Sequence, residues 1–150
     1  MFGPYFKRHL AVPFFLRNLS PTIMTKGYIY MTYDPDNIFA KILRGEIPNE
    51  TVYEDDHVLA FNDIAPHAPI HVLVIPKGPY TDMHDFSAKA SAEEITAYVQ
   101  SFSKIATILG IEKEGYRMIS NCKDFGMQEV PHLHCHILSG EQIGPMRSTL

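Results

Sequence analysis

The stretch HLHCHIL, residues 132–138, alternates histidine with apolar residues. Successive side chains of a β-strand point to opposite faces, so a strand here would carry three imidazoles on one face and apolar side chains on the other. Neighbouring imidazoles on that face would lie about 7 Å apart at Cβ. Two imidazolium charges at this separation repel by about 2 kcal/mol at an effective dielectric constant of about 20. We therefore expect at least part of the triplet to be neutral at neutral pH.

The histidine face leaves two chemical uses open, because a neutral imidazole is both a nucleophile and a metal ligand. Two strand histidines at positions i and i+2 can share a zinc ion, with further ligands taken from His71, Asp63 or Glu129. A third interpretation is that the histidines only cover a half-exposed strand. Their strict alternation after a loop favours a functional site.

The residues upstream predict an α+β domain with a mainly antiparallel five-stranded sheet, one long helix and one short helix. The short helix begins after Asn37 and ends before Gly45. The long helix begins at a capping box of Ser91 and Glu94 and ends at Gly110. Apolar runs bounded by turn residues predict the strands, at residues 51–54, 58–62, 71–75, 116–120 and 132–138.

The composition is that of one globular domain. The chain has 150 residues, of which 45% are hydrophobic and 20% are charged, which excludes a disordered or collagen-like protein. The longest apolar runs fall far short of the ~20 residues that cross a bilayer, so we expect no association with a membrane. Cys122 and Cys135 form no CxxC pair, which favours a reducing compartment and a cytoplasmic location.

Charge is distributed unevenly along the chain. Residues 1–30 carry four basic and no acidic side chains, whereas residues 31–150 carry nine basic and 17 acidic ones, a net charge of −8. Such an acidic body disfavours long nucleic acids as partners, because affinity for them comes mainly from neutralised phosphates. We expect residues 1–33 to form a basic, poorly ordered extension and residues 34–150 to form the domain. The extension is interpreted as a targeting segment or, preferably, as a plain upstream addition.

The histidine stretch resembles the signature of the histidine triad (HIT) family, in which three histidines alternate with apolar residues. The resemblance extends from about Asp36 to Met146 and implies a HIT-like fold for residues 34–150. It also implies a homodimer in which the sheet continues from one protomer into the next. Further blocks resemble the Hint branch of the family in the same order, namely Asn37-Ile38-Phe39-Ala40-Lys41-Ile42, Ala60-Phe61-Asn62-Asp63-Ile64, Ala68-Pro69-Ile70-His71-Val72-Leu73-Val74-Ile75-Pro76-Lys77 and Gly115-Tyr116-Arg117-Met118.

The resemblance implies a nucleotide hydrolase or transferase that forms a covalent nucleotidyl-histidine intermediate. The substrates of the Hint branch are purine nucleoside phosphoramidates, so a small purine nucleotide is the expected partner. His134 would be the nucleophile, with its other ring nitrogen held by the backbone carbonyl of His132. His136 would donate to a nonbridging phosphate oxygen, and His71 would lie beside His132 as support. No cofactor and no metal ion would be required.

Matching positions in the family's motifs also imply the binding residues. Asp63 would accept hydrogen bonds from the ribose hydroxyls. The base would lie in an apolar slot formed by Phe39, Ile42, Ile47, Phe61 and Ile64. The phosphate would lie against Asn121 and the backbone of Met127, Gln128 and Glu129. Without the resemblance, the five apolar residues would be interpreted as ordinary core.

Several positions depart from the family's pattern. Asn62 replaces a histidine often found beside the ribose-binding aspartate, and Met127 replaces a second glycine of the phosphate loop. Glu129 stands where many members have a Ser or Thr that relays a proton to the leaving group, which leaves the leaving-group preference open. Asn37 and Ala40 occupy the positions of the CxxC pair of zinc-binding members, so we expect no structural zinc site.

Three other functions compete with this hypothesis. A diadenosine polyphosphate hydrolase would share the nucleophile but would need room for a second nucleotide. A nucleotide-binding module would bind the nucleotide with little catalysis. A metal enzyme would use the histidine face as a set of ligands and would lose its activity on chelation.

Overall fold

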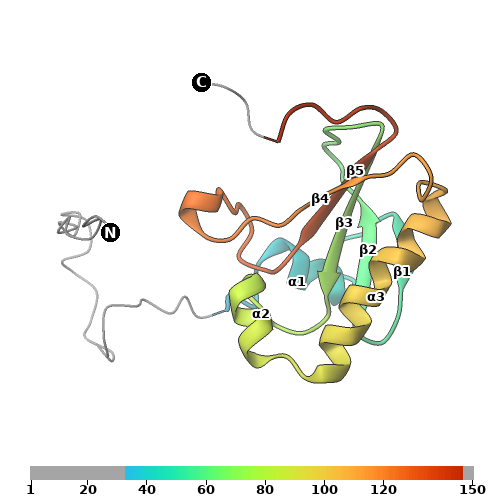
Figure 1. Cartoon of the computed structure of the whole chain (residues 1–150). Coiled ribbons are helices and arrows are strands. Elements are labelled where there is room, and N and C mark those ends of the chain that lie inside the picture. Colours follow the sequence, from blue (N-terminus) through green and yellow to red (C-terminus); the bar gives the residue numbers. More distant parts are fainter. Residues whose placement is uncertain (1–32, 147–150) are drawn as a thin grey trace, which may run out of the picture. The chain divides into compact units, whose positions relative to one another are not determined.

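A computed structural model describes residues 33–146. The predicted basic extension therefore lies, apart from Tyr33, outside the described residues. The described chain forms one five-stranded antiparallel sheet with the strand order β1-β2-β3-β5-β4 (Figure 1). The predicted α+β class and five-stranded sheet are confirmed. The strands are β1 Thr51–Glu54, β2 Val58–Asn62, β3 Ile70–Pro76, β4 Arg117–Ile119 and β5 Cys135–Ser139.

The two predicted helices are present as α1, Ile38–Leu43, and α3, Ala92–Leu109. The capping box of Ser91 and Glu94 begins α3, and Gly110 ends it in the left-handed conformation with a φ of 66°. A further helix, α2 at Met83–Lys89, was not predicted. It has seven residues and buries only Phe86, so no apolar period marks it in the sequence. Within residues 33–146, none of the helices has the length and apolar character needed to cross a membrane.

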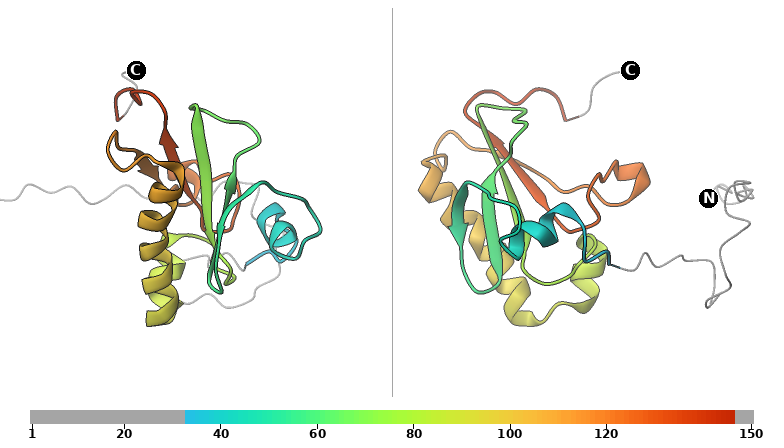
Figure 2. Two further views of the ribbon diagram at one scale, coloured as in Figure 1. Left: turned by 90° about the vertical axis from the view of Figure 1, so that its right-hand side faces the viewer. Right: turned by 180° about the vertical axis from the view of Figure 1, so that it is seen from behind.

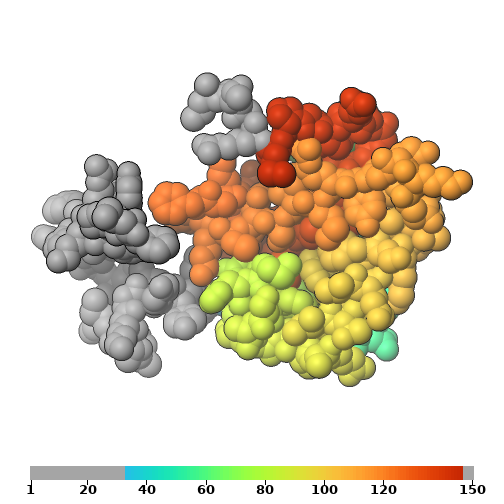
Figure 3. All heavy atoms as spheres, viewed as in Figure 1, coloured from blue at the N-terminus to red at the C-terminus, as the bar shows by residue number. Residues whose placement is uncertain are grey.

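The sheet lies between two layers of helices. Figure 2 shows α3 against one face of the sheet and α1 against the other. On the side viewed in Figure 3, α2, α3 and the segment after α3 cover most of the molecule. Alternation along β2 sends Val58 and Ala60 into the larger core cluster with α3, and Leu59 and Phe61 into a smaller cluster with α1. The two faces of the sheet are therefore both apolar.

The strand predicted at residues 132–138 is wrong in its first half, because β5 begins at Cys135. The ladder with β3 pairs Val74 with Cys135 and goes no further, and the N–H of Leu133 donates instead to the carbonyl of Tyr80 at 2.7 Å. β3 ends at Pro76, which has no N–H to extend the ladder. The predicted alternation nevertheless holds. Leu133, Cys135 and Ile137 belong to the larger cluster, whereas the rings of His132 and His134 contact Phe39 of α1.

Candidate active site

His134 lies directly before β5 and is buried. Its Nδ1 is 2.7 Å from the backbone carbonyl oxygen of His132. A carbonyl oxygen only accepts hydrogen bonds, so Nδ1 of a neutral His134 carries the proton and donates it to this bond. Nε2 is then left with a free lone pair. A nucleophilic imidazole needs this tautomer. The bond to the backbone carbonyl of His132 is the one that was predicted.

His132 is fully buried. Its Nε2 is 2.9 Å from the carbonyl oxygen of Pro76, and its Nδ1 is 2.7 Å from the hydroxyl of Tyr33. Both ring nitrogens are therefore engaged. Tyr33 is a residue of this site that the sequence did not point to, because 99 positions separate it from its partner.

His136 pairs with His71 on the neighbouring strand, and its Nδ1 lies 2.8 Å from Nε2 of His71. The prediction that His71 lies beside His132 is therefore wrong. The backbone N–H of His67 donates to Nδ1 of His71 at 3.1 Å, so a neutral His71 carries its proton on Nε2 and donates to His136. Nδ1 of His136 is the acceptor, and its own proton is on Nε2. His136 thus offers a free N–H, while His134 offers a free lone pair.

All four histidines favour the neutral form. Burial lowers the pKa of His132 and of His136 to about 4, and it also lowers the pKa of His134 and of His71. The predicted neutrality is confirmed in direction, but burial is its main cause and repulsion between rings contributes less. For His134, the His132 carbonyl and the Asp63 and Glu129 carboxylates oppose the shift by favouring the charged ring.

Three of these histidines, His71, His134 and His136, border a cavity of about 300 Å³. Predicted residues that line it are His134, His136, His71, Phe39, Asp63, Asn121, Met127 and Glu129. Other lining residues that were not predicted are His67, Leu73, Ile119, Val130 and Leu138. The cavity therefore combines the carboxylates of Asp63 and Glu129, the imidazoles of three predicted residues and an apolar wall. Pockets for polar small molecules have this mixture.

Asp63 connects the cavity wall to the histidines. One oxygen, Oδ1, accepts the backbone N–H of Ala65 at 2.8 Å, and Oδ2 lies 3.5 Å from Nε2 of His71. Asp63, His71 and His136 are also a group within residues 33–146 that could hold a metal ion, since their ligand atoms lie within 4.8 Å of one another. The 2.8 Å hydrogen bond between the two imidazoles accounts for their closeness without an ion.

The loop predicted to hold the phosphate is fixed by Gln128. Its side-chain amide donates to the carbonyls of Thr81 at 2.6 Å and Val130 at 2.9 Å, and its oxygen accepts the N–H of Lys123 at 2.9 Å. Gln128 thus supports the loop with its side chain and does not line the cavity. Met127 adopts a left-handed backbone with a φ of 56°, which explains why glycine suits this position in the family.

The predicted base slot is brought together only in part. Phe39 lines the cavity, but Ile42 and Phe61 are buried in the smaller core cluster, and Ile47 packs against that cluster. Ile64 points away from it, since its side chain is 97% exposed. Asn37, at the position of a zinc-ligand cysteine in some members, instead caps α1 by accepting the N–H of Ala40 at 2.9 Å.

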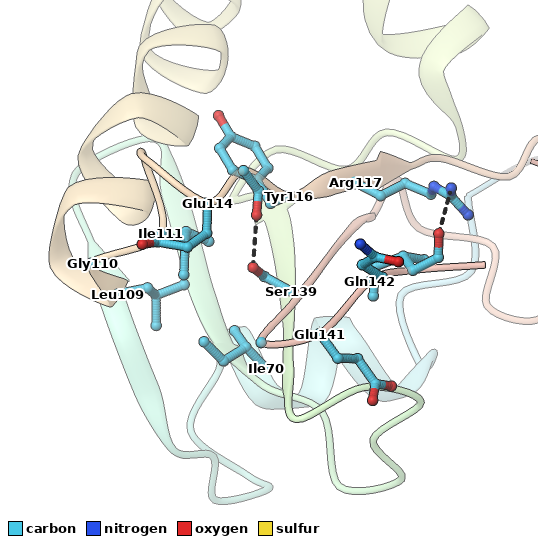
Figure 4. A pocket seen from close by; sticks show the side chains of 13 residues that line it. Ile70, Leu109, Gly110, Ile111, Glu114, Tyr116, Arg117, Ser139, Glu141 and Gln142 are labelled. Atoms are coloured by element: carbon cyan, nitrogen blue, oxygen red, sulfur yellow. Dashed lines mark hydrogen bonds between the residues drawn. The ribbon is translucent and has the colours of Figure 1, made fainter. Parts of the chain in front are cut away.

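A second cavity of about 890 Å³ lies beyond the end of α3 (Figure 4). Glu114 and Glu141 line it, and their charges are unfavourable for a phosphate. The guanidinium of Arg117 donates to the carbonyls of Ile143 at 3.0 Å and Gly144 at 2.7 Å, so it is occupied by the chain itself. None of the predicted site residues lines this cavity.

The fold and the histidine site define a class of protein. The family model for the HIT domain matches residues 44–143, and the chain belongs to the HIT family. It is 54% identical over 115 residues to an uncharacterized HIT-like protein of Azospirillum brasilense, covering 77% of this chain and 94% of that protein. It is 44% identical over 111 residues to the purine nucleoside phosphoramidase of Escherichia coli strain K12, covering 74% of this chain and 92% of that protein.

Solved structures show the same likeness. A histidine triad protein from Clostridium difficile matches with a TM-score of 0.68 and 43% identity, over 77% of this chain and all of that one. A HIT family hydrolase from Legionella pneumophila matches with a TM-score of 0.66 and 39% identity, over 71% of this chain and 95% of that one. Together with the phosphoramidase relative, these similarities support a nucleotide hydrolase role.

Proposed function

We propose that the protein hydrolyses purine nucleoside 5′-phosphoramidates through a covalent nucleotidyl intermediate on His134. The observation that carries this proposal is the 2.7 Å hydrogen bond from Nδ1 of His134 to the His132 carbonyl, which leaves Nε2 unprotonated at the cavity. The similarity to the phosphoramidase of Escherichia coli supports the same substrate class.

The reaction has two displacement steps. In the first, the lone pair on Nε2 of His134 attacks the α-phosphorus, the phosphorus–nitrogen bond of the substrate breaks, and the amine leaves with a proton. In the second, water attacks the phosphorus and the bond to Nε2 breaks, which gives the nucleoside monophosphate and restores the imidazole. The N–H at Nε2 of His136 donates to a nonbridging oxygen as its negative charge increases.

The remaining lining residues take binding roles in this proposal. Asp63 accepts from the ribose hydroxyls, Phe39 contacts the base, and Asn121 and the loop at residues 127–129 hold the phosphate. Glu129, which also lines the cavity, passes the proton to the leaving amine. A cavity of about 300 Å³ is small for a ligand site, which favours one nucleotide over the two of a diadenosine polyphosphate.

Turnover of an adenosine phosphoramidate by wild-type protein and by His134→Ala tests this function. Wild type is expected to release the amine and AMP, and His134→Ala is expected to lose at least ~10³ in kcat/KM, because the substitution removes the attacking lone pair on Nε2. His84→Ala is the matched control, since His84 is an exposed histidine of α2. Equal rates for wild type and His134→Ala would contradict the mechanism. Tight AMP binding without turnover by wild type would favour a binding module.

We also propose that the protein acts in the cytoplasm as a homodimer in which β4 pairs with its counterpart. β4 forms an edge of the sheet, and Met118 on this strand is exposed together with Val99 of α3. Light scattering during gel filtration is expected to give about twice the 17.0 kDa mass of one chain. A mass of 17.0 kDa at micromolar concentration would contradict the dimer.

A further inference from the structure

Tyr33 precedes α1 and lies outside residues 44–143, the part of the chain that matches the HIT domain. Its hydroxyl oxygen lies 2.7 Å from Nδ1 of His132, and the two rings meet edge to face with their centroids 5.5 Å apart. The segment that precedes the matched residues 44–143 thus reaches the interior of the site. This contact is not used by any step of the proposed reaction.

The direction of the contact follows from the other end of the His132 ring. Nε2 is 2.9 Å from the carbonyl oxygen of Pro76, which only accepts, so a neutral His132 carries its proton on Nε2. Nδ1 is then an acceptor, and the hydroxyl of Tyr33 is the donor. His132 is 0% exposed, so water does not reach Nδ1 in place of the hydroxyl. The ring is held at both nitrogens, by β3 on one side and by Tyr33 on the other.

The orientation of His132 matters because its backbone carbonyl holds Nδ1 of His134 at 2.7 Å. Ser120 supports the same segment, since its hydroxyl donates to the carbonyl of His134 at 3.0 Å. Residues 132–134 lie before the β5 ladder begins, so the pairing of β3 with β5 does not fix the His132 backbone. The backbone there is held by two other bonds, since the N–H of Leu133, in the same peptide group as the His132 carbonyl, donates to the carbonyl of Tyr80 at 2.7 Å and the N–H of His132 donates to the carbonyl of Val130 at 2.8 Å. The contacts of the His132 ring add to this support from the side-chain end.

We propose that Tyr33 is a positioning residue for the nucleophile, acting through His132, and this inference rests on the proposed function. Tyr33 fixes the tautomer and the orientation of the His132 ring, and thereby the carbonyl that keeps the proton of His134 on Nδ1. It touches no substrate atom. Its loss lowers the fraction of His134 that presents a lone pair at Nε2 in the correct direction, so kcat falls while substrate binding is retained.

The variant Tyr33→Phe tests the proposal, because it removes the hydroxyl and keeps the ring that packs on His132. We expect kcat on an adenosine phosphoramidate to fall at least about fivefold, as for a buried acceptor left without its donor, while KM changes less than about twofold. Tyr116→Phe is the matched control, since Tyr116 is half-exposed beside the second cavity, and its kcat is expected to be unchanged.

A spectroscopic measurement separates positioning from a loss of stability. In nitrogen-15 spectra of histidine-labelled protein, wild-type His132 is expected to be protonated at Nε2 and hydrogen-bonded but unprotonated at Nδ1. The Tyr33→Phe spectrum is expected to show a shift of the Nδ1 resonance of His132 and a mixture of tautomers at His134. The wild-type spectrum alone already tests the assignment if the variant folds poorly.

Three outcomes would overturn the proposal. These are a wild-type His132 protonated at Nδ1, an unchanged kcat in Tyr33→Phe, and a lower kcat with unchanged histidine resonances. Each can occur while wild type turns over and His134→Ala does not, so they would remove the role of Tyr33 and leave the proposed function standing. If His134→Ala were as active as wild type, the proposed function itself would fail.

Discussion

The cavity at the histidines and the cavity beyond α3 are both bordered by β5, but they differ in what lines them. The larger one, about 890 Å³, is lined by Glu114 and Glu141 and by an arginine already bound to backbone carbonyls. The smaller one, about 300 Å³, holds imidazoles whose tautomers are set by neighbouring hydrogen bonds. We therefore expect the reaction in the smaller cavity, because its imidazoles are neutral and oriented, although the other cavity has the greater volume.

The two free ring nitrogens of the smaller cavity have complementary roles. His134 presents a lone pair because a carbonyl holds its other nitrogen, and His136 presents an N–H because His71 donates to its other nitrogen. In each case a fixed partner on one side of the ring determines the chemistry on the other side. The larger cavity contains no histidine among its lining residues and so cannot supply this pair of functions.

After loss of the nucleophile itself, removal of His136 is expected to have the largest effect. His136→Ala should lower kcat by about 10² to 10³, since removing one donor from a developing phosphate charge has effects of this order. His136→Asn, which keeps an N–H donor, should recover part of the loss. Steady-state kinetics on the same phosphoramidate checks both. A loss of less than threefold in His136→Ala would remove this donor from the account.

The pH dependence is expected to follow the protonation of His134. Burial lowers its pKa below the ordinary value, so the ring remains neutral at neutral pH, and acid removes the lone pair. kcat/KM should therefore be constant above about pH 6.5 and should fall up to about tenfold per unit at lower pH. A pH profile corrected for the uncatalysed reaction measures this. A decline that begins above pH 7.5 would contradict a neutral, buried nucleophile.

Loss of the loop support is expected to have a moderate effect on binding. Gln128→Ala removes three hydrogen bonds that join the loop to Thr81, Val130 and Lys123, so KM should rise about tenfold. The free energy of unfolding should fall by about 1 to 3 kcal/mol. Kinetics and urea denaturation test these effects. Unchanged KM with reduced stability would show that the loop does not hold the substrate.

The smallest effect is expected in the larger cavity. Glu114→Gln removes a carboxylate that lines that cavity and touches none of the histidines, so kcat/KM should stay within about twofold of wild type. Assays under the conditions used for His136→Ala make the comparison direct. A tenfold loss in Glu114→Gln would mean that the larger cavity takes part in the reaction, and the contrast between the two cavities would no longer hold.

The parts of this fold that were predictable from the sequence depend on local chemistry. The capping box of Ser91 and Glu94 with Gly110 determines α3, and the apolar run ending at Pro76 determines β3. The alternation of residues 132–138 gave the correct faces. The same local pattern overestimated β5, because its ladder with β3 ends at the pair of Val74 and Cys135 and the N–H of Leu133 donates to the carbonyl of Tyr80 instead.

The errors at the site come from relations between distant segments. The register that pairs Leu73 with His136 places His71 diagonally beside His136, and no local signal in either strand encodes that register. The contact of Tyr33 with His132 likewise depends on how the chain enters the domain. The roles of Asp63, Asn121 and the base slot stay predictions, although the cavity brings Asp63, Asn121 and Phe39 together.

The central claim is that His134 becomes covalently bonded to phosphorus during turnover, and rapid quenching tests it most directly. Enzyme mixed with an adenosine phosphoramidate, quenched in denaturant above pH 9 and digested, should yield a peptide containing residues 132–138 with an added AMP group on His134. The same treatment of His134→Ala should yield none. Turnover by wild type with no adduct at any quench time, or with the adduct on His136, would contradict the account.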